Sequence, residues 1–368
     1  MTSILAASSA IEAVKHFINV MCRPHWFLII SVALLGVFLL GYRRLTRPAV
    51  AGAIGVGVVL FFLVSCLDPD FFTIIKKADN VPIVMMIFSV GFFLWLSFRQ
   101  AAVNDEAVEG GRPLTEAGSD DKVLVWPDLV YSELVSLVLM TAFLTVWAVV
   151  IRAPLEQPAD PSTAPNPSKA PWYFLGLQEM LVYFDPWLAG VVFPGLIIVG
   201  LMAIPYIDKN PLGNGYYTFV QRRFAITIFL AGFLILWVVL IIFGTFLRGP
   251  NWNFFGPYEY WDPHLSAALL NTEFHDLFWI GFLGRALPGH YLARELPGVL
   301  LLAAYFILGP LILWRLFFRK MYRQMGSIRY GVLSMLLLVM MLMPIKMVLR
   351  WTLNLHYIVG ITEWFLNV

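Results

Sequence analysis

Eight long apolar segments divide this chain, and they constrain its fold more than any other feature. A helix needs about 20 consecutive apolar residues to cross the hydrocarbon core of a bilayer. Hydrophobic residues make up 60% of the 368-residue chain and charged residues only 13%, whereas about 25% of the residues in an average soluble protein are charged. The apolar segments are continuous rather than alternating, which argues against a transmembrane β-barrel. We therefore predict an all-α polytopic membrane protein with about eight transmembrane helices.

The predicted spans are Trp26–Tyr42, Ala49–Leu67, Val81–Phe98, Leu129–Ile151, Leu188–Ile207, Phe224–Phe246, Gly298–Phe318 and Tyr330–Val348. The acidic, glycine-containing stretch Gln100–Lys122 lacks apolar periodicity and predicts a solvated, protease-sensitive linker. It separates three spans from five. The predicted regions are a surface segment (1–25), a three-helix membrane region of unknown role (26–98), a cytoplasmic linker (99–125), a five-helix membrane domain (126–350) and an interfacial tail (351–368).

The two ends of the chain are less apolar than the spans. Met1–His25 has apolar residues at helical spacing with polar residues between them, which predicts a helix lying on the membrane surface. It lacks the basic start and the cleavage site of a signal peptide. Leu355–Val368 is aromatic and amphipathic, and we predict that it is interfacial too. The alternative for both segments is a frayed terminus.

Basic residues gather in short loops and predict the orientation, because cytoplasmic loops are enriched in Lys and Arg. With eight spans, three basic loops and the linker Arg99–Asp128 fall on one side, which we assign to the cytoplasm. Lys76 and Lys77 lie on the other side, against this trend. The basic loops carry Arg43–Arg47, Lys209–Arg223 and Arg319–Arg329. The predicted periplasmic loops, which are rich in proline and aromatic residues, are Asp68–Val81, Arg152–Trp187 and Leu247–Pro297.

The residue types that hold redox cofactors are scarce. Cys22 and Cys66 are the only cysteines, and no CxxC or CxxCH motif occurs, so we expect free thiols and neither an iron–sulfur cluster nor a c-type haem. All six histidines fall in predicted loops or termini, whereas b-type haems within a bilayer need facing histidines on neighbouring helices. We therefore predict that this chain alone binds no haem. His264 and His275, near Asp262 and Asp276, form either a metal site or, the preferred interpretation, an ordinary surface loop.

Soluble-enzyme and transporter classes find little support. No Walker, GxSxG, HExxH or GxGxxG motif occurs, and the glycines of Gly52–Gly57 lie within a span, where small residues serve helix packing. Ionisable residues inside a membrane are costly and mark ion pathways in pumps. Here Glu133, Arg315 and Lys346 lie near the ends of spans, from which we expect them to snorkel. A transporter is thus disfavoured.

The loop Arg152–Trp187 is the most distinctive polar segment, because it carries closely spaced prolines and then the aromatic triplet Trp172–Phe174. Prolines fix φ and withhold donors, so we expect an extended, stiff loop. The following run Leu175–Phe184 predicts a short amphipathic helix that holds Trp172 and Tyr173 at headgroup depth. From these residues alone, an ordinary interfacial anchor is the preferred interpretation, because aromatic belts are common at both membrane interfaces.

The segment Trp126–Pro211 resembles the C-terminal half of cytochrome b, and especially subunit IV of cytochrome bf complexes. The resemblance rests on WPDLVYSEL (Trp126–Leu134), EQPADP (Glu156–Pro161), APWYF (Ala170–Phe174) and GVVFPGLIIVGLMAIPYID (Gly190–Asp208). It implies that residues 126–350 are a cytochrome b C-terminal-like domain. It also implies that Pro171–Phe174, here called the aromatic corner, form one wall of a quinol oxidation pocket near the periplasmic face. A flat quinone ring suits a stiff apolar wall. The implied quinol-binding residues are Pro171, Trp172, Tyr173 and Phe174.

The corner departs from the family pattern at two positions. The family usually carries an acidic proton acceptor where this chain has Pro171, and a proline where it has Ala170. The nearest downstream acid is Glu179, followed by Asp185. We predict Glu179 as the substitute base, with Tyr173 as its catalytic partner. Otherwise another subunit supplies the acceptor, or the pocket no longer turns over.

The resemblance implies a haem-free subunit of a bacterial quinol:cytochrome c oxidoreductase in the inner (cytoplasmic) membrane, active only within its complex. It implies as partners a cytochrome b N-terminal-half subunit with b-type haems, a Rieske iron–sulfur protein, a c-type cytochrome, lipids and quinone, and no nucleic acid. The aromatic loop Arg248–Pro297 either seats a periplasmic redox partner or caps the helices. The alternative function is a structural subunit of a redox or photosynthetic supercomplex without its own turnover, and a transporter is less favoured.

Overall fold

The computed structural model describes residues 2–115, 117, 122–151, 158, 160–162, 164–213, 216–267, 270–361 and 366–368. Within these ranges the protein is helical except for loops, two isolated β-bridges and one two-stranded sheet. Eight helical segments of the described chain are long and apolar enough to cross a membrane, which confirms the predicted fold class. They are Pro24–Leu45, Pro48–Ser65, Asn80–Glu109, Val125–Val150, Leu188–Ile207, Arg223–Leu247, Tyr291–Leu316 and Arg319–Leu353.

The first part of the chain contains five helices that begin and end at clear signals. Pro24, Pro48 and Pro69 start the second, third and fourth of them, where the missing N–H of proline leaves no donor unsatisfied. Asp68 caps the fourth by accepting from two backbone N–H groups at 3.0 Å. The elements are α1 (Thr2–Met21), α2 (Pro24–Leu45), α3 (Pro48–Ser65), α4 (Pro69–Ile75) and α5 (Asn80–Glu109).

Many helices of the second part contain π-helical or 3₁₀ turns. Four consecutive elements, α9 to η6, form one continuous span that ends at Leu247. The transmembrane elements and those that join them are η2 (Val125–Leu129), α6 (Val130–Val150), η3 (Trp172–Phe174), α7 (Leu175–Met180), η4 (Leu188–Val192), α8 (Phe193–Ile207), α9 (Arg223–Leu230), η5 (Ala231–Val238), α10 (Val239–Ile242) and η6 (Phe243–Leu247). The remaining elements are η7 (Pro250–Trp252), α11 (Phe274–Asp276), η8 (Leu277–Phe282), α12 (Tyr291–Leu316), α13 (Arg319–Leu353), β1 (Gly360–Ile361) and β2 (Leu366–Asn367).

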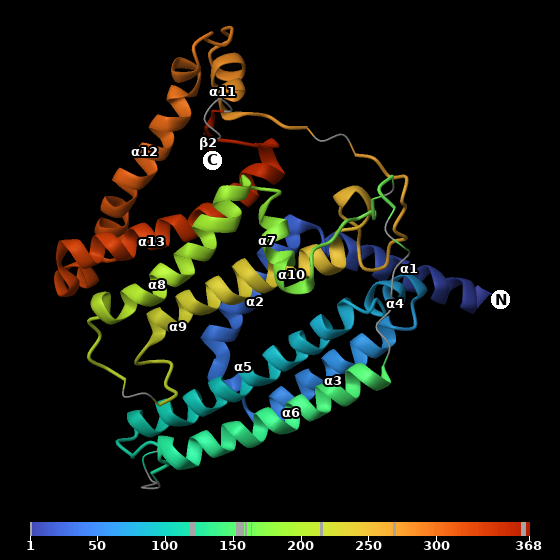
Figure 1. Ribbon diagram of the computed structural model, residues 1–368, viewed down its shortest axis with the longest axis vertical. Helices are drawn as coiled ribbons and strands as arrows, with labels where there is room; N and C mark the ends of the chain where they lie inside the picture. The colour runs from blue at the N-terminus through green and yellow to red at the C-terminus, as the bar shows by residue number, and fades with distance from the viewer. Residues whose placement is uncertain are drawn as a thin grey trace.

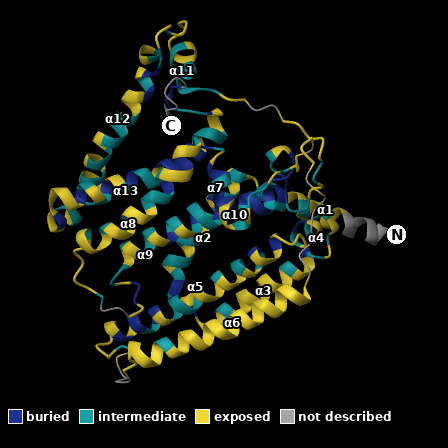
Figure 2. Cartoon of the chain, viewed as in Figure 1, coloured by how far each residue is buried: buried dark blue, intermediate teal, exposed yellow. Residues whose placement is uncertain are grey.

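The spans are packed very unevenly. In Figure 1, α8, α9, α10 and α13 lie together, and α2 passes between this group and α5. The largest buried apolar cluster belongs to that group and includes Tyr183, Leu240, Phe243 and Met343. By contrast, no described residue of α6 is buried, as Figure 2 shows by its yellow ribbon. An apolar helix that packs on so little of its own chain faces lipid or another subunit.

The loops gather at two ends of the helices. At one end, the side-chain amide of Asn104 donates to the carbonyl of Tyr217 at 2.9 Å, and Arg329 Nε donates to the carbonyl of Tyr206 at 2.9 Å. At the other end, Lys15 pairs with Asp68, the Ser65 and Tyr258 hydroxyls share a hydrogen bond, and the Asn251 N–H donates to the Asn166 side chain. The grouping agrees with the predicted topology, whereas the assignment of each end to cytoplasm or periplasm stays a prediction.

The predicted linker 99–125 needs a correction, because α5 continues to Glu109 and buries part of it. Asp105 is 2% exposed and accepts hydrogen bonds from the Tyr42 hydroxyl at 2.8 Å and from the N–H groups of Phe219 and Val220. This carboxylate therefore joins α5 to α2 and to the loop before α9. Some of the polar residues that suggested a solvated linker thus bind the end of α5 to neighbouring parts of the protein. Residues 116 and 118–121 of the predicted linker lie outside the described ranges.

The two chain ends also differ from each other. Along α1, Ile11, Val14 and Phe17 are exposed, so its apolar face is open for the predicted contact with the membrane surface. The described part of the C-terminal tail is instead fastened to the protein. Leu355, Ile358, Val359 and Ile361 form a buried cluster, and β1 pairs with β2 in antiparallel register. A frayed C-terminus is thus excluded for this segment, whereas its interfacial position stays a prediction.

Candidate functional site

The aromatic corner is a rigid turn that leads directly into a helix. The Phe174 N–H donates to the Pro171 carbonyl at 2.8 Å and closes the 3₁₀ turn η3, which α7 follows without a break. Trp172 is partly buried in a cluster with Ile83 of α5 and Ile241 of α10. Tyr173 and Phe174 are each 51% exposed. One aromatic residue thus anchors the corner, and the next two present their rings outward.

The sequence prediction of a helix over Leu175–Phe184 was too long, since α7 ends at Met180 and turns follow. Gln178 on this helix holds the loop that precedes the corner. Its side-chain oxygen accepts from the Ala170 N–H at 2.8 Å, and its amide donates to the Ser168 carbonyl at 2.9 Å. Because both ends of one amide are engaged, the loop before the corner is held against α7.

Glu179 lies on the buried face of α7, at 0% exposure. Arg248 Nε donates to its Oε2 at 3.0 Å and Arg248 Nη2 donates to its Oε1 at 2.7 Å, while the Tyr183 hydroxyl donates to the same Oε1 at 3.1 Å. Burial, with the negative charge of Glu179 nearby, raises the pKa of Tyr183 well above its usual value. Both carboxylate oxygens already accept hydrogen bonds. Glu179 is therefore a fully buried, ion-paired carboxylate.

Arg248 begins the loop after η6 and connects that loop to the corner. Its Nη1 donates to the Trp252 carbonyl at 2.7 Å, and its guanidinium carbon lies 3.8 Å from the centre of the Phe254 ring. A guanidinium that bonds a carboxylate in a bidentate manner and stacks on an aromatic ring is strongly held. The ion pair therefore fixes the start of the aromatic loop relative to α7.

Lys169 stands two residues before Pro171, and its amine points back into the protein. Nζ donates to the carbonyl of Thr245 at 2.8 Å and lies 4.9 Å from the centre of the Trp261 ring. Lys77 lies 4.6 Å from the centre of the same ring. Burial, together with the positive charges of Lys77 and Arg248, lowers the pKa of Lys169 to about 7, although the charge of Glu179 acts in the opposite direction.

The structure thus brings the predicted residues Pro171, Trp172, Tyr173 and Phe174 together at one corner, with Glu179 beneath it on the next helix. Sequence reasoning did not single out Gln178, Arg248 or Lys169 as members of this site. Two signals were present: Lys169 is the only charged residue in the stretch APNPSKAPWYF, and Arg248 follows immediately after a long apolar span. Of the predicted EQPADP motif, Glu156, Gln157 and Ala159 lie outside the described residues.

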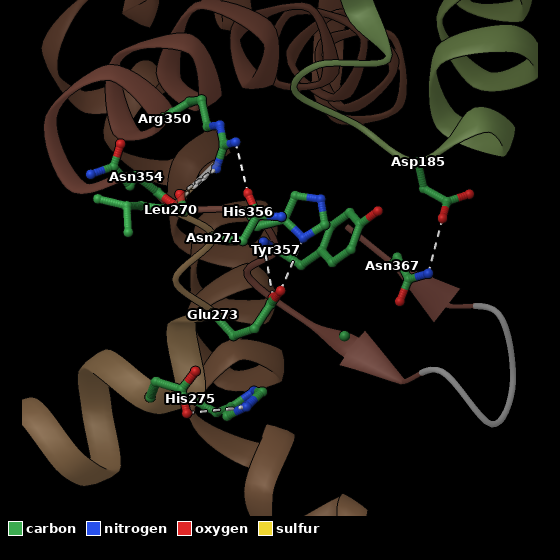
Figure 3. A network of polar contacts seen from close by, with 12 residues as sticks. Asp185, Leu270, Asn271, Glu273, His275, Arg350, Asn354, His356, Tyr357 and Asn367 are labelled. Carbon is green, nitrogen blue, oxygen red and sulfur yellow. Dashed lines mark hydrogen bonds and ion pairs between the residues drawn. The ribbon is translucent and has the colours of Figure 1, made fainter. Parts of the chain in front are cut away.

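A second polar cluster lies at the C-terminal tail (Figure 3). His356 Nδ1 lies 3.0 Å from Glu273 Oε1, and the Asn367 amide donates to Asp185 at 2.9 Å. Lys346 was predicted to snorkel, yet it is 1% exposed and donates to the His356 carbonyl at 2.6 Å, because the tail folds over it. This cluster fastens the tail to α13 and to the loop before α11.

The histidines of the aromatic loop are not arranged around a common centre. His264 and Asp262 share one turn, in which the His264 N–H donates to the carboxylate at 2.9 Å. His275 Nδ1 instead lies 2.9 Å from Glu295 of α12, an ion-pair contact without the angle of a hydrogen bond. Among the described residues, no group of three or more His, Cys, Asp and Glu side chains is placed to hold a metal ion.

Residues 158–255 match the family described as cytochrome b (C-terminal)/b6/petD. This part of the chain is therefore similar to the C-terminal domain of cytochrome b. The matched range contains the corner, Lys169, Glu179 and Arg248, so every member of the site lies within the part of the chain that is similar to this family. It begins after the WPDLVYSEL segment and extends beyond Pro211 to Phe255.

Two relatives illustrate the extent of the similarity. A cytochrome b of Marchantia polymorpha is 26% identical over 117 residues, which is 30% of this chain and 29% of the relative. A menaquinol:cytochrome c reductase cytochrome c subunit of Geobacillus thermodenitrificans is 34% identical over 92 residues, which is 23% of this chain and 36% of the relative. The matches thus span only about a third of either relative. No solved structure matches the chain.

Proposed function

We propose that this chain is a haem-free, multi-pass membrane subunit of a bacterial quinol:cytochrome c oxidoreductase, and that its corner forms one wall of the periplasmic-side quinol oxidation pocket. The observation that carries the proposal is the position of the corner inside the matched cytochrome b C-terminal domain, with the Tyr173 and Phe174 rings half exposed. A rigid wall with outward-facing rings offers a quinone apolar area at a low cost in conformational entropy.

The pocket residues take distinct roles in this proposal. Trp172, partly buried against α5 and α10, fixes the wall, and Pro171 sets its direction. Tyr173 and Phe174 contact the quinone ring, and the Tyr173 hydroxyl both donates to and accepts from a quinol oxygen. Glu179 was predicted from sequence as the base. Its bidentate pair with Arg248 supports a positioning role instead, in which the pair holds the corner against the loop after η6.

The remaining parts of the reaction belong to partners in this proposal. A cytochrome b N-terminal-half subunit carries the b-type haems, a Rieske protein carries the iron–sulfur cluster and a c-type cytochrome receives electrons. The exposed helix α6 provides an apolar surface for a membrane partner or lipid. The aromatic loop after Arg248 lies at the same end as the corner and is where a periplasmic partner would dock.

The experiment is purification of the native assembly with its subunit composition, visible spectrum and quinol:cytochrome c activity. We expect paired b-haem bands and an iron–sulfur partner, and no b-type Soret band from this chain expressed alone. Stoichiometric haem in the isolated chain would contradict the haem-free assignment.

A second function, a structural subunit without turnover, is favoured by one observation. Pro171 stands where the resembling family carries an acid, and Glu179 is held by Arg248. An assembly with full haem content that oxidises no quinol would establish this alternative, whereas wild-type quinol oxidation that depends on the corner would eliminate it.

A further inference from the structure

Lys169 is a partly buried amine beside the corner, and the function proposed above assigns it no role. We propose that Lys169 is the proton acceptor for the quinol, in place of the carboxylate that the corner lacks. This inference rests on the proposed function, because it concerns the same pocket. Lys169 lies in the loop before the corner, whereas the base predicted from the sequence lies on α7.

The surroundings of the amine suit a neutral base better than a permanent cation. An ammonium group has three donors, yet within the described chain its hydrogen-bond acceptor is the Thr245 carbonyl and no carboxylate forms an ion pair with it. A cation partly removed from water without a counter-ion is unfavourable, so the neutral form is favoured. Structural lysines at a surface normally keep the ammonium in water.

The charged groups around Lys169 come from three elements. Lys77, from the turn between α4 and α5, lies 4.6 Å from the centre of the same Trp261 ring, and Arg248 follows η6. Among the residues that the structure describes, the acid whose charge acts on Lys169 is Glu179, and its charge is largely offset by Arg248. The two cations favour loss of the amine proton, which agrees with the pKa of about 7. Through Lys77 the front helices thus help to tune the site.

Two buried polar atoms near the amine provide places for a ligand oxygen or water. The Thr245 hydroxyl and the Trp261 indole N–H have no hydrogen-bond partner among the residues that the structure describes. Thr245 is the residue whose carbonyl accepts from Lys169, and Trp261 is the ring on which the amine lies. A quinol hydroxyl or a water chain at these atoms would connect the amine to the substrate.

Oxidation of one quinol to quinone releases two protons and two electrons. The lone pair of neutral Lys169 Nζ takes one hydroxyl proton and becomes ammonium, and the second proton leaves to water. The two electrons pass to two one-electron acceptors of the partner subunits, an iron–sulfur centre and a b-type haem, and the quinol becomes quinone. The ammonium then releases its proton to the periplasmic solvent, and the amine is neutral again.

Two substitutions in the assembled complex separate a base from an anchor. Lys169→Arg keeps a cation that donates to the Thr245 carbonyl and stacks on Trp261, but it stays protonated and accepts no proton. Lys169→Gln removes the charge and the base together. We expect both variants to lose turnover by roughly 10²-fold, the usual contribution of general base catalysis, with haem content unchanged. Lys209→Gln, in a loop at the opposite end of the helices, is the matched control and should keep wild-type turnover.

The pH profile gives a second measure. A base of pKa about 7 must be neutral to accept a proton, so wild-type turnover should rise as pH increases through 7, and both variants should lack this rise. Wild-type turnover in Lys169→Arg, or an unchanged pH rise in either variant, would overturn the proposal and leave Lys169 as an anchor.

A readout without turnover distinguishes this inference from the proposed function. Reductive ¹³C-methylation of the purified complex gives one NMR signal per lysine, and the signal missing in Lys169→Arg identifies Lys169. We expect it to titrate near pH 7. Titration above about pH 10, the normal range of lysine, would refute the base even in an active complex. Titration near 7 in a complex that oxidises no quinol would instead refute the proposed function.

Discussion

Two of the buried carboxylates lie at opposite ends of this protein, and they are satisfied in different ways. Glu179, at the corner, forms a bidentate ion pair with Arg248. Asp105, at the end of α5, accepts instead from the Tyr42 hydroxyl and from the backbone N–H groups of Phe219 and Val220. Glu179 has one charged partner, Arg248, besides the Tyr183 hydroxyl, whereas Asp105 has neutral donors.

This difference predicts how a substitution at each end affects the stability of the protein. Removing the partner of a buried ion pair leaves an uncompensated charge, which costs more than losing one of several hydrogen bonds. One substitution at the corner end should therefore lower the free energy of unfolding strongly, whereas each substitution at the Asp105 end should lower it by a smaller amount. Four substitutions test this contrast, and they follow in order of their expected effect on the free energy of unfolding.

Arg248→Gln should have the largest effect. It leaves the Glu179 carboxylate buried without a cation and should lower the free energy of unfolding by about 3–5 kcal/mol. Reversible unfolding in mixed detergent micelles measures the change. The double variant Glu179→Gln with Arg248→Gln removes both charges and should recover much of the loss. An equal loss in the single and double variants would show that charge pairing is not what holds the corner.

Asp105→Asn should come second. The amide keeps one acceptor but loses the charge, so the donors from Tyr42 and Phe219 bind more weakly, and we expect a loss of about 1.5–3 kcal/mol. Limited proteolysis gives a local readout, because the end of α5 should become cleavable before Gly110. Glu106→Gln, an exposed neighbour on the same helix, is the control. If Glu106→Gln and Asp105→Asn behave alike, Asp105 does not fasten the loop.

Tyr42→Phe should cost less, about 0.5–1.5 kcal/mol, because it removes one donor to Asp105 while the two backbone donors remain. The same unfolding assay applies. Combined with Asp105→Asn, the two losses should be non-additive, since the residues share a hydrogen bond. Strict additivity would mean that the 2.8 Å contact between them contributes nothing to stability.

Tyr173→Phe should change stability least, by less than about 0.5 kcal/mol, because the side chain is half exposed and keeps its ring. Its effect should appear in turnover, with roughly a tenfold loss of quinol:cytochrome c activity, or about 1.4 kcal/mol. Haem content checks assembly, and Tyr206→Phe, at the far end of α8, is the control. Wild-type turnover would reduce the corner to an interfacial anchor.

The sequence predicted the eight spans because a continuous run of about 20 apolar residues is enough by itself to cross a bilayer as a helix. It also predicted the aromatic corner, because proline restricts its own backbone and that of its neighbour. Helix ends were less accurate. The polar composition of residues 100–109 indicated a linker, but their polar groups meet partners from other loops, and the helix continues to Glu109.

The sequence by itself therefore determined the class of this protein, its spans and the composition of its corner, since each depends on residues close together in the chain. The tertiary structure alone decided which polar groups meet. Glu179 pairs with Arg248 across 69 positions, Lys169 reaches Thr245 across 76, and Asp105 accepts from Phe219 across 114. Packing of the helices selects these partners, because a buried charge must be satisfied by whatever donors the neighbouring helices bring to it.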